Sequence, residues 1–358
     1  MTERIRLVVL FGGRSAEHEV SCTTAVNVLQ ALDPARYDVV PVGVTHEGRW
    51  VLAEEAAKLL AAGGPAALPP SLAAEGPTVE PLATVGEEAP SRTVVFPLLH
   101  GPFGEDGTVQ GLLELADVPY VGSGVLGSAA AMDKITAKRL AAQAGVPQPT
   151  WIALRDQNLD PGLAARVERE LGWPVFVKPA NLGSSVGVTK ASDADALAEA
   201  VRLAFSYDER ALVEEAIAGR EIECGVLGDP PEASLPGEIR PSREFYDYED
   251  KYLGDGAALL VPAPLSAEET ATVRALALAA FAAVEAEAMA RVDFFYEEGG
   301  RGFLLNEVNT IPGFTPISMY PKMWEASGVP YTELIDRLVQ LAVDRHARRS
   351  NRIGRRRH

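Results

Sequence analysis

The chain has 358 residues, a length that exceeds one ordinary domain and predicts two or three. Its formal net charge of −17 argues against nucleic acid as the main partner, and 47% hydrophobic residues are enough for a sizeable core. Two cysteines far apart in the chain, Cys22 and Cys224, lack metal-ligand spacing, which predicts a reducing compartment without disulfides. The five histidines are scattered, so no zinc cluster is expected.

The ends of the chain give no sign of membrane insertion. The apolar run near the N-terminus lacks a cleavage site and is interpreted as a strand, and the run Ala275–Val284 is much too short to span a bilayer. A soluble, cytoplasmic protein without a membrane partner is therefore expected. The segment Arg345–His358 carries seven arginines and no acid. A solvated, disordered end explains it better than contact with nucleic acid or acidic lipid.

The first elements predict a parallel sheet. Ile5–Phe11 reads as a buried strand, Gly12-Gly13 as a turn, the next stretch to about Leu32 as a helix, and Tyr37–Val44 as a second strand. Such a βαβ unit places a ligand crevice at the carboxyl ends of its strands. Glu17 lies in that crevice position at a helix N-terminus, where helix capping explains an acid about as well as ligand binding does.

Two glycine-rich segments follow in the N-terminal part. The strand Thr93–Leu99 leads into the loop His100–Gly107, at the usual position of a substrate loop in such sheets. Gly122–Gly127 matches GxGxxG, but a dinucleotide site needs an acid about 20 residues further on. No acid lies between Asp133 and Asp156. We therefore interpret Gly122–Gly127 as a turn into a helix.

A second region begins near Pro147, where the composition changes. The strand Pro174–Pro179 ends in a lysine and precedes the loop Asn181–Lys190. Within this loop GxSxG suggests a hydrolase nucleophile at Ser185, but the loop runs into a β-like stretch and the later histidines lie at or beside the basic tail. It is not a Walker loop either. A Gly/Ser loop beside Lys178 can close over phosphates, and an ordinary solvent-facing turn explains it about equally well.

Two further segments suit a nucleotide site. The strand Ala211–Ile217 is followed closely by Glu221, an arrangement that suits adenine and ribose contacts, although acids at a strand end are commonly just solvated. The polar and aromatic stretch Phe245–Tyr252 is bordered by loops and is interpreted as a lid.

The most informative stretch is Arg291–Gly313, which predicts a β-hairpin. With the turn near residue 300, opposed residue numbers sum to about 600, so Asp293 faces Glu307 and Arg291 faces Asn309. Side chains alternate along a strand, so all four project to one side. An ion pair on a solvated face would explain one carboxylate pair. Hard oxygen ligands among apolar neighbours instead favour Mg²⁺ held with substrate phosphates.

Seven segments, in chain order, resemble the D-alanine–D-alanine ligase family of the ATP-grasp superfamily. They are FGGRSAEHEVS, LLHGPFGEDGTVQG, MDKITAK, VFVKPANLGSSVGVTK, YDYEDKY, ARVDFF and LNEVNTIPGFTPISMYP. The resemblance covers essentially Ile5–Asp344 and implies an α/β protein, with α+β character in its ATP-grasp part. It implies a Rossmann-like N-terminal domain (1–132), a central ATP-grasp subdomain (133–223), a C-terminal catalytic domain (224–347) and a basic disordered tail (348–358).

The family's chemistry is implied in the same way. ATP phosphorylates the carboxylate of one D-alanine, and the amine of a second D-alanine attacks the acyl phosphate. The products are D-alanyl-D-alanine for peptidoglycan synthesis, ADP and phosphate. The resemblance also implies two Mg²⁺ ions, with Mn²⁺ as an alternative metal, and a cytoplasmic homodimer with two D-alanine subsites.

The resemblance assigns roles to residues that match the family motifs. The implied metal ligands are Asp293, Glu307 and Asn309. The implied ATP contacts are Lys134, Lys178, Ser184, Ser185, Glu214, Ile217, Glu221 and Lys251. The implied D-alanine contacts are Glu17 and His100 for the first molecule, and Ser318 and Met319 for the second. The implied catalytic residues are Arg291 and the backbone N–H of Gly313 at the tetrahedral intermediate, and Glu17, Ser184 and Tyr252, which tie loop and lid together.

Three alternatives remain open at this point. A D-alanine–D-lactate ligase of the same superfamily typically carries histidine at the lid position where this chain has Tyr252, which favours the dipeptide here. A hydrolase acting through Ser185 would need no ATP. A nucleotide-binding protein without catalysis would not need Arg291 beside the metal ligands.

Overall fold

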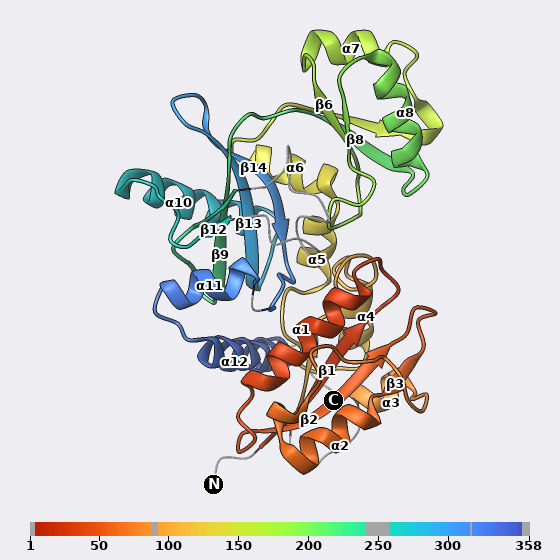
Figure 1. Cartoon of the computed structure of the whole chain (residues 1–358), viewed down its shortest axis with the longest axis vertical. Coiled ribbons are helices and arrows are strands. Elements are labelled where there is room, and N and C mark those ends of the chain that lie inside the picture. Colours follow the sequence, from red (N-terminus) through yellow and green to blue (C-terminus); the bar gives the residue numbers. More distant parts are fainter. Residues whose placement is uncertain (1–3, 87–91, 241–257, 316, 353–358) are drawn as a thin grey trace.

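The computed structural model describes residues 4–86, 92–240, 258–315 and 317–352. Three sheets form three parts of the molecule, with the N-terminal sheet at one end and the central sheet at the other (Figure 1). Among the described residues no helix is both long and apolar enough to cross a bilayer. Both cysteines are buried and free, as expected.

The N-terminal sheet is mainly parallel, with strand order β3-β2-β1-β4. β1 pairs in parallel with both β2 and β4, and β3 is antiparallel. The apolar run of β1 is completely buried, which is typical of a strand covered on both faces. The elements of this part are β1 (Ile5–Gly12), α1 (His18–Ala31), β2 (Tyr37–Val44), β3 (Trp50–Leu52), α2 (Glu54–Gly63), η1 (Pro65–Ala67), α3 (Pro81–Val85), β4 (Thr93–Pro97) and α4 (Thr108–Leu115).

The central sheet is antiparallel, with strand order β5-β8-β6-β7, and α7 and α8 pack on it (Figure 1). Its core consists of side chains from these strands and the two helices. The elements are β5 (Trp151–Arg155), η2 (Asp156–Asn158), α7 (Leu163–Glu170), β6 (Val175–Pro179), β7 (Thr189–Ala191), α8 (Ala194–Phe205) and β8 (Arg210–Glu215).

The C-terminal sheet has the order β12-β11-β9-β13-β14, with β10 beside β9. The expected domain boundary at residue 223 falls inside β9, whose pairing partners all belong to this sheet. The elements are β9 (Arg220–Gly228), β10 (Pro231–Ala233), β11 (Gly237–Arg240), β12 (Ala258–Leu260), α10 (Ala267–Ala283), β13 (Ala288–Glu297), β14 (Gly302–Asn309), α11 (Met319–Ala326) and α12 (Tyr331–Ser350).

Helices α5 (Val125–Met132) and α6 (Lys134–Gln143) connect the parts. Asp133 is the N-cap of α6, and its side chain accepts a hydrogen bond from the Thr136 backbone N–H (2.7 Å). Buried alanines of both helices belong to the core of the C-terminal sheet. Although α6 opens the expected central domain, it therefore packs on the C-terminal one.

The GxGxxG segment makes a close junction between domains. It turns into α5, as predicted, and the Gly124 N–H donates to Glu287 Oε2 (3.1 Å). A Cβ at Gly127 would lie 2.3 Å from the carbonyl oxygen of Glu285. The glycines thus allow α5 to approach the turn before β13 closely.

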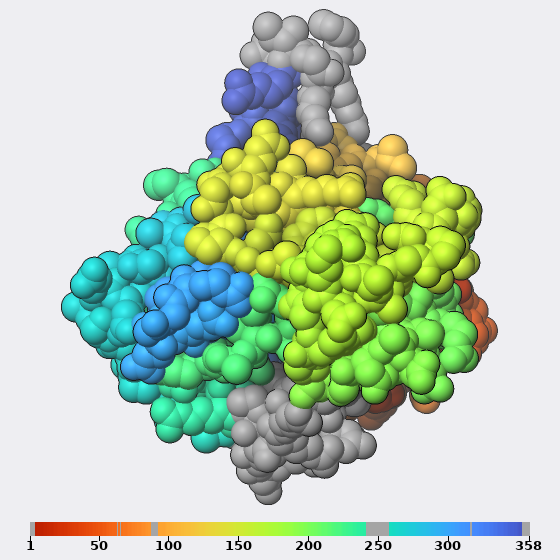
Figure 2. Space-filling view, turned by 90° about the horizontal axis from the view of Figure 1, so that it is seen from above, coloured from red at the N-terminus to blue at the C-terminus, as the bar shows by residue number. Residues whose placement is uncertain are grey.

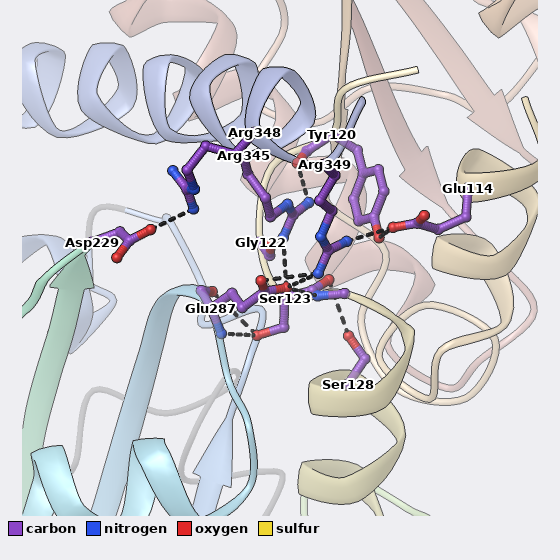
Figure 3. A network of polar contacts seen from close by, with 11 residues as sticks. Glu114, Tyr120, Gly122, Ser123, Ser128, Asp229, Glu287, Arg345, Arg348 and Arg349 are labelled. Atoms are coloured by element: carbon purple, nitrogen blue, oxygen red, sulfur yellow. Dashed lines mark hydrogen bonds and ion pairs between the residues drawn. The ribbon is translucent and has the colours of Figure 1, made fainter. Parts of the chain in front are cut away.

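The expectation of a disordered basic end is wrong for its first part, because α12 continues to Ser350. Arg345 is buried, donates to the carbonyl of Tyr120 (2.7 Å) and of Gly122, and pairs with Glu287 (3.3 Å; Figure 3). Arg349 bridges Glu287 (2.8 Å) and Glu114 (2.7 Å), while Arg348 pairs with Asp229. The arginines balance carboxylates of two domains, so this helix end is ordered. Residues 353–358 of the expected tail lie outside the described residues.

Candidate active site

The β13–β14 hairpin has the predicted register at its functional end. Arg291 pairs with Asn309 and Asp293 with Glu307, as strand parity predicts. A β-bulge between Asp293 and Phe294 then changes the register by one residue in the part of the hairpin nearer the turn, where Phe294 pairs with Leu305. The bulge lies on the turn side of the carboxylates, so side-chain alternation keeps the four polar residues on one face at the hairpin end.

The guanidinium of Arg291 is held by two carboxylates. Its Nε and Nη2 donate to Asp293 Oδ1 (2.8 Å) and Oδ2 (2.7 Å), and Nε lies 3.2 Å from Glu223 Oε2. Burial works against the charged form of Arg291, but Asp293 and Glu223 outweigh it and raise the pKa of Arg291 well above its usual value. The site therefore contains more than a surface ion pair, and Glu223 from β9 is a member that the sequence did not reveal.

The oxygens of this cluster suit a hard cation. Asn309 Nδ2 donates to Asp293 Oδ2 (2.9 Å) and lies 3.5 Å from Glu307 Oε1, so three predicted metal ligands converge. Two carboxylates and an amide oxygen are a ligand set for Mg²⁺, and the amide would turn its oxygen inward to bind the ion. The donor chemistry fits the metal that the sequence predicted.

A cavity of about 990 Å³ opens between the central and C-terminal sheets, large enough for a nucleotide. Seen from above, the central domain (yellow-green) and the hairpin tip near residue 300 (blue) lie side by side on one face of the molecule (Figure 2). The predicted site residues that line the cavity are Lys134, Lys178, Ser185, Glu214, Ile217, Glu221, Arg291, Asp293 and Glu307.

A buried charge cluster forms one wall of this cavity. Lys178 donates to Glu214 Oε2 (2.6 Å) and to Asn306 Oδ1 (3.2 Å), and Lys138 of α6 pairs with Glu214 Oε1. Burial raises the pKa of Glu214, but the two lysines reverse this and leave its pKa below the usual value. Burial lowers the pKa of Lys138 despite Glu214. Lys138 was missed, although it lies one helical turn after Lys134 in the MDKITAK motif.

The Gly/Ser loop connects the central and N-terminal domains. Ser184 donates to Glu17 Oε1, and the Lys134 ammonium donates to the carbonyl of Leu182. Ser184 and Ser185 have φ values of 48° and 60°, which are uncommon for residues with side chains. The loop leads into the strand β7 instead of a helix, so it lacks the strand-to-helix geometry of a hydrolase nucleophile elbow.

The N-terminal crevice contains two predicted residues and one further acid. Glu17 and His100 are buried, and burial lowers the pKa of His100 although Glu17 opposes it. Glu105 is also buried, and its Oε2 accepts the Gly101 N–H (2.6 Å). Burial and the charge of Glu17 raise the pKa of Glu105 to about 8. Glu105 lies in the predicted substrate loop, but nothing local in the sequence distinguished it from Asp106.

The segment after β14 brings the remaining residues together. The Ser318 hydroxyl accepts the Thr315 N–H (3.0 Å) and would lie 2.7 Å from a Cβ at Gly313. The Met319 side chain is buried against Ile239 and Met323, so its backbone is the part that can face a ligand. Tyr252 and Lys251 of the expected lid lie outside the described residues.

A Rossmann-like domain followed by two sheets that enclose a nucleotide-sized cavity defines an ATP-grasp enzyme. The family described as D-ala D-ala ligase N-terminus matches residues 6–123, and D-ala D-ala ligase C-terminus matches residues 140–340. The chain belongs to the D-alanine–D-alanine ligase family.

Relatives and solved structures agree with this assignment. The chain is 48% identical over 354 residues to a D-alanine–D-alanine ligase of Geobacillus thermodenitrificans, covering 96% of each chain. It is 49% identical over 369 residues to the ligase of Kineococcus radiotolerans, covering 95% of this chain and 97% of the relative. The D-alanine–D-alanine ligase structure from Coxiella burnetii matches with a TM-score of 0.81 and 37% identity, over 98% of this chain and 97% of that one. The VanG D-Ala:D-Ser ligase of Enterococcus faecalis matches with a TM-score of 0.81 and 34% identity, over 95% of this chain and 100% of that one.

Proposed function

We propose that the chain ligates two D-alanines to D-alanyl-D-alanine in an ATP-dependent reaction that serves peptidoglycan synthesis. The observation that carries this proposal is the hairpin end, where Arg291 lies beside Asp293, Glu307 and Asn309 at the nucleotide-sized cavity. A protein that merely bound ATP would not need a guanidinium among its metal ligands.

The phosphates of ATP bind to Lys134, Lys178 and the lid residue Lys251, under the Ser184-Ser185 loop. Ile217 and Glu221 contact adenine and ribose, and Glu214 orients Lys178 through their 2.6 Å contact. Asp293, Glu307 and Asn309 would hold two Mg²⁺ ions, with Mn²⁺ as an alternative. When bound, the metal neutralises phosphate charge and polarises the transferred phosphoryl group.

The amino acids bind between the N-terminal and C-terminal domains. Glu17 pairs with the ammonium of the first D-alanine, beside His100, while Ser318 and the Met319 backbone hold the carboxylate of the second. The first carboxylate attacks the γ-phosphorus of ATP to give an acyl phosphate and ADP. The second amine then attacks the acyl carbon, loses a proton, and expels phosphate. Arg291 and the Gly313 N–H stabilise the oxyanion, and Ser184, Glu17 and Tyr252 close the site so that water does not hydrolyse the acyl phosphate.

The second substrate separates this proposal from its near alternatives. ADP release is measured with D-alanine alone and with D-alanine plus D-lactate or D-serine, and the product is identified by its mass. D-Alanyl-D-alanine as the main product at neutral pH is expected. Greater turnover with D-lactate or D-serine would replace the proposed product, and ATP-independent ester cleavage that is lost in Ser185→Ala would favour the hydrolase.

We further propose that the chain has three domains, divided near residue 132 and just before β9, near residue 219. We also propose that it works as a cytoplasmic homodimer. Exposed apolar side chains support self-association: Leu115 of α4 is 86% exposed and Leu126 of α5 is 66% exposed, and the two helices pack together. A second copy would cover them. Light scattering should give twice the mass of one chain, and Leu115→Glu with Leu126→Glu should give monomers; a wild-type monomer would contradict the dimer.

A further inference from the structure

The carboxyl ends of β1 and β2 bring together two histidines that lie far apart in the sequence. Because the strands are parallel neighbours, with Gly12 opposite Val44, the chain leaves both at the same edge of the sheet. His18 begins α1 and His46 follows β2 closely, so their rings stack with centroids 3.9 Å apart and an interplanar angle of 24°. The expectation that the histidines do not cluster is therefore wrong for this pair.

Glu19 completes a set of three metal-ligating side chains. One potential ligand atom from each of His18, Glu19 and His46 lies within 4.8 Å of the other two, and His46 Nε2 is 3.9 Å from Glu19 Oε1. Ligand atoms around a tetrahedral ion are about 3.4 Å apart, given bonds of about 2.1 Å. The His46 and Glu19 side chains are 63% and 76% exposed, so both can rotate toward a shared ion. Binding requires the His46 ring to tilt out of its stack on His18, because stacked rings cannot direct their in-plane lone pairs at one ion.

The third ligand, His18, is already oriented. Its Nδ1 lies 2.7 Å from the carbonyl oxygen of Gly13, and because a carbonyl only accepts, Nδ1 carries the proton. In the neutral ring the lone pair is therefore on Nε2. A histidine that binds a metal almost always donates its other ring N–H to such an acceptor, which fixes the ring and its tautomer. His18 is buried, so packing also restricts its ring.

We propose that His18, Glu19 and His46 form a site for a divalent transition metal ion such as Zn²⁺. Two imidazoles and one carboxylate suit Zn²⁺ or Co²⁺ better than Mg²⁺, which prefers oxygen ligands. Three protein ligands leave a position for water on the exposed side. None of the three lines the nucleotide cavity, so the site is separate from the Asp293 cluster.

Metal binding to the full-length protein tests this site directly. Excess Mg²⁺ and a non-hydrolysable ATP analogue keep the proposed magnesium site at Asp293, Glu307 and Asn309 occupied. Co²⁺ is then titrated into the protein while its visible d–d absorption is followed. One equivalent should bind and be displaced by Zn²⁺. His46→Gln and Glu19→Gln should each weaken Zn²⁺ binding at least about 10-fold, the lower end of what loss of even an outer-shell partner costs.

A second histidine–carboxylate pair supplies the matched control. His346 Nε2 lies 3.2 Å from Asp117 Oδ1, and the described residues place no third His, Cys, Asp or Glu with this pair at metal-ligand spacing. His346→Gln should leave Zn²⁺ affinity unchanged, and circular dichroism verifies the fold of each variant. Equal Zn²⁺ affinity in wild type and His46→Gln, or an equal loss in His346→Gln, would overturn the site. Because the measurement is binding, its outcome does not depend on the ligase activity.

Discussion

Arg291 gives the active site a positive charge that its carboxylates share. Asp293 holds it through two hydrogen bonds and Glu223 through a third contact, so one positive charge offsets part of the acids' negative charge before any ligand arrives. Removing one charge-bearing oxygen from this cluster should therefore affect charge stabilisation during the reaction more than folding.

The variant Glu307→Gln tests that statement. Glutamine keeps the shape of the side chain but removes its charge, so turnover should fall about 10²–10³-fold, as when a preorganised electrostatic group is lost. ADP release measures the loss, and thermal unfolding should stay near that of wild type. The control Glu297→Gln removes a carboxylate paired with Arg301 at the hairpin tip and should retain activity. Wild-type activity in Glu307→Gln would contradict the metal assignment.

Glu105 makes stability depend on pH. Its pKa rises from 4.5 to about 8 on folding, so between these values the folded protein retains a proton that the unfolded chain has released. The free energy of unfolding should then fall as pH rises through this range, by at most about 1.4 kcal/mol per pH unit. Glu105→Gln keeps an acceptor for the Gly101 N–H and removes the titration. Urea unfolding should show a flatter pH profile for the variant, and parallel profiles would refute the shift.

Three buried ionisable side chains could not be predicted from their own sequence neighbourhoods. Glu223 matters because β9 lies beside β13, and strand order between distant segments is not a local property. Lys138 and Glu105 likewise acquire their roles from groups in other elements, Glu214 and Glu17 respectively. By contrast, Asp293 and Glu307 were predictable, since a hairpin register depends only on parity and the turn.

Among the elements, the Gly/Ser loop joins two domains. Its hydroxyl contact from Ser184 to Glu17 crosses from the central to the N-terminal domain, and two consecutive serines have positive φ. A loop under such constraint stays closed only while its contacts are made.

Ser184→Ala should uncouple ATP use from dipeptide synthesis. Without the contact to Glu17 the loop opens more often, so water reaches the acyl phosphate and more than one ADP is released per dipeptide. The ADP-to-dipeptide ratio measures this effect. Ser206→Ala is a suitable control, because Ser206 bonds only locally, to the Leu203 carbonyl (2.6 Å), at the end of α8. A ratio of one in Ser184→Ala would show that the contact does not close the site.

For the whole molecule, the end of α12 determines how two domains meet. Arg349 bridges Glu114 of the N-terminal domain and Glu287 just before β13, while its neighbour Arg348 makes an exposed pair with Asp229 (Figure 3). The N-terminal and C-terminal domains form opposite sides of the proposed D-alanine site, with Glu17 on the N-terminal domain and Arg291 on the C-terminal domain.

Arg349→Met should therefore raise the KM for D-alanine, by up to about 10²-fold if the domains shift by about 1 Å. The KM for ATP should change little, because the nucleotide cavity is lined by the central and C-terminal domains and α6. Arg348→Met is the matched control on the same helix and should behave as wild type. Equal changes in the two variants, or equal changes in both KM values, would speak against a positioning role.

Without the family resemblance, the arrangement of the three domains was the least predictable part of the structure. The parallel N-terminal sheet follows from its βαβ pattern, and the GxGxxG segment turns into a helix as its sequence predicts. The ordered arginines of α12 were missed, because a run of positive charge reads as solvated until its partners Glu114 and Glu287 are placed beside it.

The distribution of apolar cores has a consequence for cooperativity. One continuous core joins Leu7 and Phe11 of β1 to Phe314, Tyr320 and α12, so the N-terminal and C-terminal parts should unfold in a single transition. The central sheet has a separate core and reaches α6 through a small cluster around Ile135. A rigid-body swing of the central sheet therefore disturbs only this small apolar cluster and polar contacts, while hydrogen exchange in the other two sheets stays slow.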